Sequence, residues 1–391
     1  MRVLHVIPSV SGVHGGPSQV LALMEQGLCA TGVSVTTATT DDDGPARRLR
    51  INARPVEAHG ARRIYFRKWF DFYKVAPAML PWLWRHVRTF DVVHIHALFS
   101  FTSTAASFVA RWRGVPYVVR PLGTLTSYGV TQRRPWLKRV SLALIEGPML
   151  RHAAAVHFTS QAEWDEAAVL GIPLRGIVIP LGVEAPEPGD RQILVRDYPE
   201  LEGRWVFLFL SRLDPKKNVE GLLHALATVN RQHTRASLVV AGDGPEAYVA
   251  RLKELANSLG IAERVYWLGH VGGPRKAAAF AAADAFVLPS FSENFGIAAV
   301  EALLAGLPCV LGQGVALAKD VEEAGAGLVT APEPDAIARA LEQLLGDDAL
   351  RRDMGARGKA LAERQYSTRV MAEKLIALYE DIRSRRGTDA V

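Results

Sequence analysis

The sequence predicts an α/β protein with two doubly wound parallel-sheet domains in tandem. Short β-branched runs alternate with longer alanine- and leucine-rich segments of helical period. This is the β-α-β rhythm of a parallel sheet covered by helices. The rhythm breaks once, at 182–192, in a run rich in proline, glycine and acidic residues, and then restarts. A length of 391 residues exceeds one ordinary core, so we expect two domains joined by this linker.

In the first half, MRVLHVIP predicts a strand, and SQVLALMEQGLCATG predicts a helix that ends at Gly32. Their apolar spacing and the glycine stop signal favour this assignment. Short runs rich in β-branched residues predict five further strands. These runs are VSVTTATT, VVHIH, PYVVRP, AVHFTS and GIVIPLG.

In the second half, strands are predicted in WVFLFLSRL, ASLVVAGDG, RVYWLG, AFVLPS, PCVLG and AGLVTA. Helices are predicted in EGLLHALATVNRQ and GIAAVEALLAG, at 335–346 and 349–365, and in a long amphipathic segment at 367–386. Ligands of such domains bind beyond the carboxyl ends of the strands. We therefore expect the site in a cleft between the two domains.

Composition excludes several classes of protein. No charge-free window of 18 apolar residues occurs, so no membrane-spanning helix is expected. The start, MRVLHVIPSV, is too short and too strand-like for a signal peptide. The two cysteines, Cys29 and Cys309, have apolar neighbours, which predicts core residues in a reducing compartment. A cytoplasmic protein is therefore expected.

Two glutamates stand in the nearly uncharged run SFSENFGIAAVEALLAGLPCV. Glu293 follows a predicted strand, and Glu301 lies about two turns further on, so both carboxylates can face one side of the cleft. Carboxylates are acceptors that suit sugar hydroxyls. Backbone N–H groups at the helix start add an anion or hydroxyl site, formed by Asn294, Phe295 and Gly296. The alternative is a helix cap and a surface residue.

Cations and glycines follow the neighbouring strands. SRLDPKKN places Arg212 just after a strand and Lys217 in the next loop, and two cations there suit a diphosphate. AGDGP offers Gly242 and Gly244 for a close backbone approach, unless it is an ordinary turn.

Two more glycine-rich loops follow strands. LGHVGG carries His270 and Val271, whose backbone is a candidate for recognising a nucleotide base. VSGVHGGPSQ places Gly15 and Gly16 before the first helix, where a phosphate can approach the helix N-terminus. Neither GxGxxG nor GxxxxGK[ST] occurs, so no dinucleotide fingerprint or P-loop is supported. No His/Cys cluster has metal-ligand spacing, so neither a metal nor a cofactor is expected.

The ordered set GGP, SRLDPKKN, AGDGP, LGH and SENFGIAAVE resembles the retaining glycosyltransferases of family 4, with their E-x7-E motif. The resemblance covers nearly the whole chain. It implies a GT-B fold, in which two Rossmann-like domains face a central cleft. The expected parts are an acceptor domain at 1–185, a linker at 182–192, a donor domain at 193–366 and a last helix at 367–386 that completes the first domain.

The resemblance also implies roles for the residues. Glu293 would hold donor-sugar hydroxyls, together with the backbone of Asn294, Phe295 and Gly296. Glu301 would accept hydrogen bonds from the nucleotide ribose. Arg212 and Lys217 would neutralise the leaving diphosphate, with help from the backbone of Gly16. The remaining donor-binding positions are Gly15, Gly242, Gly244, His270 and Val271. Because Glu293 is matched to donor holding, front-face substitution is implied instead of a covalent intermediate.

The acceptor side departs from the family pattern. Family members often carry His-Gly after the strand corresponding to PYVVRP, whereas this chain has Leu122 there, which becomes a candidate acceptor contact. Arg120 is either an acceptor or phosphate contact or a structural ion-pair member. His96 ends a predicted strand at the cleft, with His94 on the same face. We expect His96 among the catalytic residues and both histidines near the acceptor, unless they are core histidines.

The first half of the chain is basic. Residues 47–139 hold 18 Lys and Arg against 3 Asp and Glu, interleaved with aromatic residues in RRIYFRKWFDFYK, PWLWRHVR, RWRG and QRRPWLKR. This mixture suits the anionic inner face of the cytoplasmic membrane, where the protein would bind peripherally. The alternatives are a solvated face, with a plain core and a basic rim, and a nucleic-acid surface, although no nucleic-acid motif accompanies the stretch.

The sequence therefore predicts a retaining, metal-independent hexosyltransferase that uses a nucleotide-diphosphate sugar. The acceptor would be a glycan or a polyprenyl- or other lipid-linked saccharide, in synthesis of the exopolysaccharide or lipopolysaccharide type. One alternative is a GT-B sugar-nucleotide 2-epimerase, against which the basic, aromatic face argues. Another is a non-catalytic nucleotide-sugar binding protein, against which the intact set of Arg212, Lys217, Glu293 and Glu301 argues.

Overall fold

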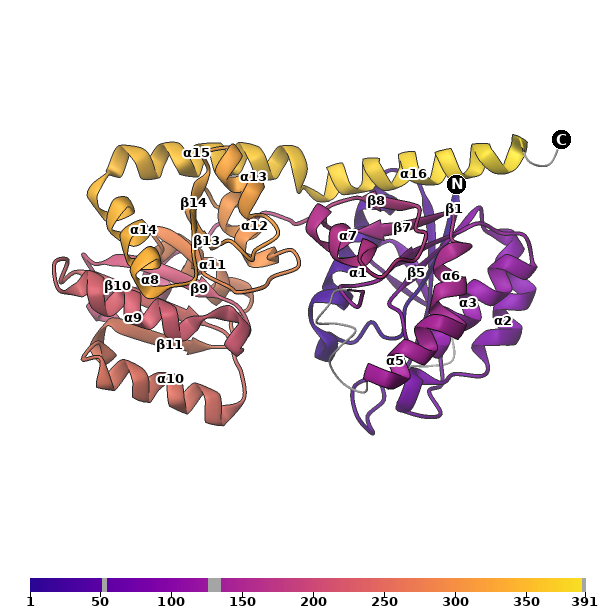
Figure 1. The fold of residues 1–391 in the computed structure, drawn as a ribbon, viewed down its shortest axis with the longest axis horizontal. Helices are drawn as coiled ribbons and strands as arrows, with labels where there is room; N and C mark the ends of the chain where they lie inside the picture. The colour runs from indigo at the N-terminus through magenta and orange to yellow at the C-terminus, as the bar shows by residue number, and fades with distance from the viewer. Residues whose placement is uncertain (51–54, 126–134, 389–391) are drawn as a thin grey trace. The chain divides into compact units, whose positions relative to one another are not determined.

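The computed structural model describes residues 1–50, 55–125 and 135–388. It forms two compact units (Figure 1). The first unit comprises residues 1–182 and the end of the chain from Thr368, and the second comprises Val183–Ser367. The central cleft, and any site that needs both units, stays a prediction.

The first unit contains an eight-stranded sheet of order β3-β4-β2-β1-β5-β6-β7-β8. All neighbours pair in parallel except β3 and β4. The strand order reverses between β1 and β5. The strands are β1 (Arg2–Val6), β2 (Ser34–Thr40), β3 (Val56–Ala58), β4 (Ala61–Phe66), β5 (Val92–His96), β6 (Tyr117–Arg120), β7 (Ala155–Phe158) and β8 (Gly176–Val178).

Helices cover this sheet, and the last helix of the chain is one of them (Figure 1). Its start packs tightly, because a Cβ at Gly182 would lie 2.6 Å from the Cα of Thr368. The α-helices are α1 (Gly16–Ala30), α2 (Met79–His86), α3 (Phe101–Trp112), α5 (Pro135–Ser141), α6 (Gly147–Arg151), α7 (Gln161–Ala168) and α16 (Thr368–Thr388). Single turns are η1 (Gly12–His14), η2 (Phe72–Lys74), η3 (Val87–Thr89) and the π-helix η4 (Leu142–Glu146).

Strand β4 lies inside the basic, aromatic stretch that was expected to form a surface. Arg63 is buried and donates from Nε to both carboxylate oxygens of Glu25 on α1, at 3.1 Å each. Lys68 is also buried and pairs with Asp42 and Asp71. The surface interpretation is therefore wrong for these two cations, because each pairs with a fully buried carboxylate, Glu25 for Arg63 and Asp42 for Lys68.

The second unit contains a parallel six-stranded sheet of order β11-β10-β9-β12-β13-β14. The strand order reverses between β9 and β12, and open α/β sheets bind ligands beyond the carboxyl ends of the strands at such a switch point. The strands are β9 (Trp205–Leu210), β10 (Ala236–Ala241), β11 (Val265–Gly269), β12 (Ala285–Leu288), β13 (Cys309–Gly312) and β14 (Gly327–Thr330).

The four helices predicted in the second unit are present, whereas the helices at 191–197, 246–258, 273–282 and 318–323 were not predicted. Asp190 caps α8 by accepting a hydrogen bond from the N–H of Gln192 at 2.9 Å, so a helix begins within the segment predicted to be a linker. The α-helices are α8 (Arg191–Asp197), α9 (Val219–Asn230), α10 (Glu246–Ser258), α11 (Gly273–Ala282), α12 (Ile297–Leu304), α13 (Ala318–Glu323), α14 (Pro334–Gly346) and α15 (Asp348–Gln365). Single turns are η5 (Pro199–Leu201), η6 (Pro215–Lys217) and η7 (Ala262–Arg264).

Candidate functional site

The loops that follow β9, β10, β11 and β12 form one hydrogen-bonded edge of the second sheet. The N–H of Leu213 donates to the carbonyl of Asp243 at 2.8 Å, and that of Gly242 donates to Gly269 at 2.7 Å. The N–H of Phe291 donates to Lys216 at 2.8 Å. Backbone hydrogen bonds therefore hold together the four strand ends that carry the predicted donor-site residues.

Lys217 and Glu293 meet at the switch point between β9 and β12. The ammonium of Lys217 donates to Oε2 of Glu293, and the two side chains are 12% and 20% exposed. This exposure is large enough for a ligand to reach the pair. Asn218, in the left-handed conformation at φ 56°, fixes the loop because its amide donates to the carbonyl of Pro332 at 2.8 Å and to that of Pro289 at 3.2 Å.

The backbone of Glu293 is held by the loop after β13. Its N–H donates to Gly314 at 2.9 Å, and its carbonyl accepts from Ala316 at 3.0 Å. A Cβ at Gly314 would lie 2.0 Å from the carbonyl oxygen of Phe291, so this approach needs a glycine. The Glu293 carboxylate is thus presented from a loop that is fixed on both sides.

The segment Asn294–Gly296 forms the loop that leads into α12, which begins at Ile297. Gly296 has φ 88° and precedes the helix. The Phe295 ring is buried against Tyr366, with ring centroids 5.7 Å apart. The side chain of Phe295 therefore serves packing, and only the backbone of this residue remains for the predicted ligand contact.

Glu301 forms a second lysine–glutamate pair that the sequence interpretation missed. Nζ of Lys276 on α11 lies 2.6 Å from Oε1 of Glu301 on α12, and the glutamate side chain is 8% exposed. The available signal was the run GGPRK, in which a lysine follows a glycine-rich strand end. Both predicted glutamates therefore carry a cationic partner.

Gly242 and Gly244 are required by the adjacent loop. Gly242 has φ 144°, and a Cβ there would lie 1.9 Å from the carbonyl oxygen of Ser211. A Cβ at Gly244 would lie 2.3 Å from the carbonyl oxygen of Leu213. The loop that contains the two glycines therefore packs closely against the backbone of Ser211 and Leu213, which lie on either side of Arg212. Arg212 itself is exposed.

The remaining predicted donor contacts lie at loop positions. His270 is exposed directly after β11. Val271 follows it and is partly buried. In the first unit, Gly15 has φ 62° and precedes α1, which begins at Gly16 with Pro17 in its first turn. The predicted glycine turn at a helix N-terminus is therefore present, and its phosphate contact stays a prediction.

A buried charge cluster flanks this glycine turn, and it was not foreseen. Nε2 of His14 lies 2.8 Å from Oδ2 of Asp42, which is fully buried. Nζ of Lys74 lies 2.9 Å from Asp42, and Lys68 pairs with it too. Burial raises the pKa of Asp42, but the two lysines outweigh burial and hold this pKa below its usual value. The cluster ties His14 and its turn to the strand ends.

His94 and His96 lie in the core of the first unit, not at its surface. Both are fully buried, and His5 and His157 are buried beside them. Nδ1 of His5 lies 2.8 Å from Nε2 of His96, and Nδ1 of His94 lies 2.7 Å from the Tyr379 hydroxyl. Burial, together with the neighbouring Arg120, lowers the pKa of all four histidines. This placement favours the core-histidine alternative, and the acceptor and catalytic roles stay predictions.

Arg120 is 3% exposed and reaches Sδ of Met24 at 3.9 Å. Burial lowers the pKa of Arg120 to about 10. Within the described ranges it forms no ion pair, which does not favour the structural ion-pair alternative. Leu122 follows β6 in the left-handed region at φ 59°, and the N–H of Gly123 donates to Oε1 of Glu163 at 2.8 Å.

Three of the buried histidines could be ligands for a metal ion by distance alone. Ring nitrogens of His5, His94 and His96 lie within 4.8 Å of one another. The group includes no carboxylate, and the buried Arg120 guanidinium lies close enough to lower the pKa of these rings. A divalent cation would add charge beside a buried cation, which is costly. The charge beside these rings therefore argues against a metal ion at the cluster.

Two family models match the chain. Glycosyl transferases group 1 matches residues 190–361, and the glycosyl transferase 4-like domain matches residues 15–182. The two matches cover different halves and together take in most of the sequence.

Among curated proteins, the GDP-mannose-dependent alpha-(1-6)-phosphatidylinositol monomannoside mannosyltransferase of Mycobacterium tuberculosis is 32% identical over 209 residues, covering 50% of this chain and 54% of that protein. The alpha-monoglucosyldiacylglycerol synthase of Streptococcus pneumoniae is 27% identical over 317 residues, covering 78% of this chain and 68% of that protein. The chain spans about half the length of the mycobacterial relative.

Solved structures match nearly the whole chain. The HepE protein of Anabaena in complex with UDP has a TM-score of 0.78 at 20% identity, covering 97% of this chain and 100% of that one. Sucrose-phosphate synthase from Thermosynechococcus elongatus has a TM-score of 0.76 at 19% identity, covering 98% and 100%. At such identities the likeness establishes the fold alone.

Proposed function

We propose a function from the premise that the chain belongs to the GT-B glycosyltransferases of the family 4 type. In this proposal, the protein transfers a hexose from a nucleotide-diphosphate sugar to a glycan or a lipid-linked saccharide. The family and the GT-B fold predicted from the sequence are both confirmed by the two family models and the full-length structural matches.

The observation that carries the proposal is the pair of lysine–glutamate contacts on one sheet edge. Lys217 and Glu293 follow β9 and β12, the two strands at the switch point, and Lys276 on α11 meets Glu301 on α12. Acidic acceptors beside cations suit a ligand that offers sugar hydroxyls and a diphosphate together. A site for an apolar or purely anionic ligand would not need both kinds of group.

In the proposed reaction, the bond between the anomeric carbon and the phosphate oxygen breaks as the acceptor oxygen bonds to the same face of the sugar. Because the new bond forms on the face from which the phosphate departs, the configuration is retained, and the acceptor proton moves to the departing phosphate. Arg212 and Lys217 would stabilise the charge that develops on the diphosphate, a term often worth several kcal/mol. Glu293 would hold the sugar hydroxyls and Glu301 the ribose. Two cations would supply the charge that a metal ion supplies elsewhere, so we propose metal-independent transfer.

The acceptor class follows from the exposed surface of the first unit and from the names of two relatives. The name of one relative includes the word phosphatidylinositol, and the name of the other includes diacylglycerol. Among the described residues, Phe291 is the sole exposed large apolar side chain of the second unit, whereas the first unit exposes Trp69, Phe70, Phe72, Trp84, Phe108, Trp112, Trp136 and Leu144. Such side chains beside cations suit a membrane interface. We therefore propose a lipid-linked acceptor and a peripheral position on the inner face of the cytoplasmic membrane.

No described helix has both the length and the apolar character needed to cross a membrane. The choice of base and sugar stays open, since one relative is named for GDP-mannose and one structural match holds UDP.

The test is a thermal-shift titration of the full chain with UDP, GDP and ADP in the absence of metal. A nucleotide that binds only the native state at about 100 times its Kd adds roughly 2.7 kcal/mol of stability. We expect one nucleotide to stabilise the wild type and to act much more weakly on Glu301→Gln. Glu254→Gln, on the exposed face of α10, is the matched control. If no nucleotide shifts the wild type, with or without metal, the donor site is absent and the proposal fails.

Incubation with the donor alone separates the enzymatic alternatives. A 2-epimerase converts the sugar nucleotide without an acceptor, whereas a transferase releases nucleotide and needs an acceptor for full rate. A binding protein would give the thermal shift and neither product.

A further inference from the structure

A basic cavity lies at the amino ends of strands in the first unit, at the edge of the sheet opposite to the one where ligands of α/β sheets bind. Its volume is about 360 Å³. Pro116 and Tyr117 lie at the start of β6, Ala154 precedes β7, and Arg175 precedes β8. Because these strands are parallel, all four residues share one edge. The cavity is therefore separate from the glycine turn after β1.

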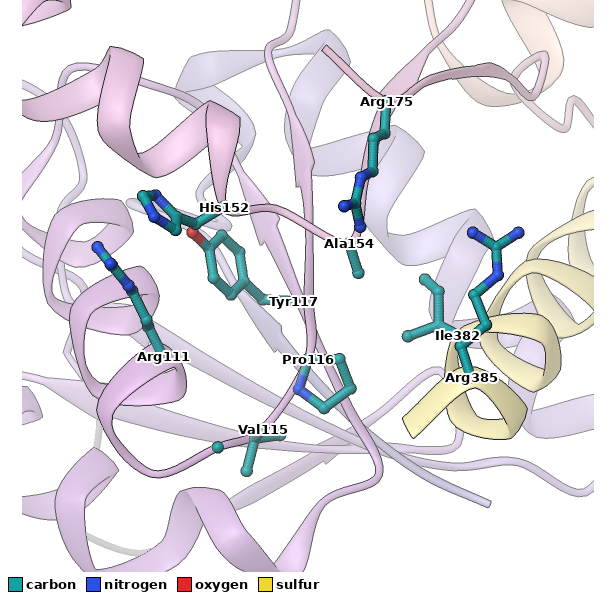
Figure 2. A pocket seen from close by; sticks show the side chains of 10 residues that line it. Arg111, Val115, Pro116, Tyr117, His152, Ala154, Arg175, Ile382 and Arg385 are labelled. Carbon is teal, nitrogen blue, oxygen red and sulfur yellow. The ribbon is translucent and has the colours of Figure 1, made fainter. Parts of the chain in front are cut away.

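Four basic side chains surround this cavity (Figure 2). They are Arg111 at the end of α3, His152 just after α6, Arg175, and Arg385 on α16. Nη2 of Arg385 lies 2.7 Å from Asp381, so its charge is neutralised in part. Within the described ranges, neither Arg111 nor Arg175 forms an ion pair with a carboxylate. These two guanidinium groups leave the cavity with an uncompensated positive charge, which favours an anion.

An apolar cavity adjoins the basic one. Its volume is about 300 Å³, and the two cavities share Arg111 and Tyr117 as a common wall. The Tyr117 hydroxyl is already used, since it donates to the carbonyl of Met149 at 2.7 Å. Apolar side chains supply most of the remaining lining, from α3, η4 and α6: Phe108, Trp112, Leu144, Ile145, Pro148 and Met149.

The apolar cavity opens among exposed side chains. Trp112 is 68% exposed and Leu144 is 72% exposed, although both are large and apolar. Phe108 lies beside Trp112 with ring centroids 5.8 Å apart. Exposure of these apolar side chains to water is unfavourable, and the free energy falls when an apolar partner covers them.

We propose that the two cavities together bind one anionic phospholipid, with its phosphate headgroup between Arg111 and Arg175 and its acyl chains against Phe108, Trp112 and Leu144. The charge of one cavity and the apolar lining of the other complement the two ends of this ligand. A soluble phosphate would use the basic cavity alone. A nucleic acid would stack on aromatic rings set along a basic groove, whereas here Phe108 and Trp112 line one cavity and Arg175 lines the other, with Arg111 in the wall that they share.

The inference rests on the proposed function in one respect, since it assigns the proposed membrane contact to a definite site. It goes further in placing that site at the amino edge of the first sheet, apart from every residue assigned to donor binding. Lipid held there would anchor the protein and leave the carboxyl edge of the sheet for the acceptor.

Vesicle co-sedimentation of the full chain tests the proposal. The probes are phosphatidylcholine vesicles with and without phosphatidylglycerol, at low salt, because the electrostatic part weakens as ionic strength rises. We expect the wild type to prefer the anionic vesicles. Each of Arg111→Gln and Arg175→Gln should lower the partition coefficient roughly fivefold. Arg339→Gln, an exposed arginine on α14 in the other unit, is the matched control and should leave the coefficient unchanged.

A second arm separates a lipid site from a phosphate site. Trp112→Ser and Leu144→Ser should weaken binding to anionic vesicles and leave the affinity for glycerol 3-phosphate unchanged in calorimetry. Glycerol 3-phosphate should bind far more weakly than the vesicles. The proposal is overturned if the vesicles show no anionic preference, if the two arginine variants bind as the control does, or if the apolar variants bind vesicles normally.

Nucleotide binding provides an independent readout for the same variants. Arg111→Gln and Arg175→Gln should keep the nucleotide-dependent thermal shift of the wild type. Loss of vesicle binding with an intact nucleotide shift supports the lipid site. A wild type that binds anionic vesicles but shifts with no nucleotide would defeat the donor-site proposal and leave the lipid site standing.

Discussion

The Tyr379 hydroxyl lies 2.7 Å from Nδ1 of His94, although 285 positions separate them in the sequence. Tyr379 belongs to α16, and His94 lies on β5 of the first sheet. Both side chains are fully buried. The last helix therefore contributes a polar contact to the interior of the first unit, next to the histidine cluster.

The histidine cluster predicts that the first unit loses stability in mild acid. Burial and Arg120 lower the pKa of His5 and His157 from 6.5 to about 3. Burial and neighbouring cations lower the pKa of His94 and His96 as well. The unfolded chain binds more protons below about pH 6.5, so the free energy of unfolding falls as pH decreases from there toward 3. Each histidine contributes up to about 1.4 kcal/mol per pH unit.

Urea unfolding at several pH values between 5 and 8 checks this prediction. His157→Gln keeps a donor for the carbonyl of Ile179, which His157 Nε2 approaches at 2.8 Å. This variant should reduce the slope of the free energy of unfolding against pH by the contribution of one histidine. His224→Gln, exposed on α9, is the control for a histidine outside the cluster. A stability that stays constant from pH 7 to pH 5 would contradict the assignment of neutral buried histidines.

Tyr379→Phe should destabilise the first unit by about 1–3 kcal/mol, because a buried ring nitrogen of His94 loses its partner. A double-mutant cycle with His94→Leu isolates this contact, since the second background has no ring nitrogen to leave unpaired. Urea unfolding of the four proteins gives the coupling energy. Equal costs of Tyr379→Phe in both backgrounds would mean that the hydrogen bond contributes nothing and that α16 is held by packing alone.

Most strands, and helices such as α1, α14, α15 and α16, were predictable because their local signals are strong, whereas the strands β3 and β4 and the helices α2, α3 and α10 were not predicted. The predicted helices at 335–346 and 349–365 appear as α14 and α15 within one residue at each end. The order of strands in the second sheet places Arg212, Lys217 and Glu293 on neighbouring strand ends, as the motif spacing suggested. Fold class and the grouping of the residues predicted to bind the donor thus follow from local pattern and parallel-sheet topology.

The contacts that the sequence did not predict are long-range pairings of charges. Arg63 and Lys68 resemble surface cations in sequence, and only the positions of Glu25, Asp42 and Asp71 in the fold bury or neutralise them. Pairing of side chains far apart in the chain has no local period, so pattern analysis cannot find it. The Lys276–Glu301 pair also joins residues distant in the sequence, and the run GGPRK was the local signal available for it.

Gly242→Ala should cost about 3 kcal/mol, because its Cβ would lie 1.9 Å from the carbonyl oxygen of Ser211, and backbone on both sides has to move. Gly272→Ala is the matched control, since nothing lies within 4 Å of a Cβ there and its φ is −149°. Urea unfolding measures both costs. We expect the surviving Gly242→Ala protein to bind nucleotide poorly, because the displaced loop carries Arg212. Equal stability of the two variants would show that the β10 loop can relax freely.

Lys276→Gln should lower nucleotide affinity roughly fivefold, because Glu301 would lose a charged hydrogen-bond partner in a site that is only partly screened by water. Lys276→Arg should recover part of the loss. Calorimetry with the nucleotide selected by thermal shift measures the change. Tighter binding in Lys276→Gln would instead indicate that the lysine competes with the ligand for the carboxylate.

Lys217→Ala should lower kcat for donor turnover by about 10²–10³-fold, because Lys217 is proposed to neutralise charge that develops only as the diphosphate leaves. Nucleotide release from the donor, with and without EDTA, is the measurement, and Lys216→Ala in the same turn is the control. We expect EDTA to leave the wild-type rate unchanged, since Arg212 and Lys217 would supply the positive charge. A rate that EDTA abolishes and Mg²⁺ restores would transfer this role to a metal ion. A Lys217→Ala protein with raised KM and normal kcat would mean that the lysine binds donor and transition state equally well, as a ground-state contact does.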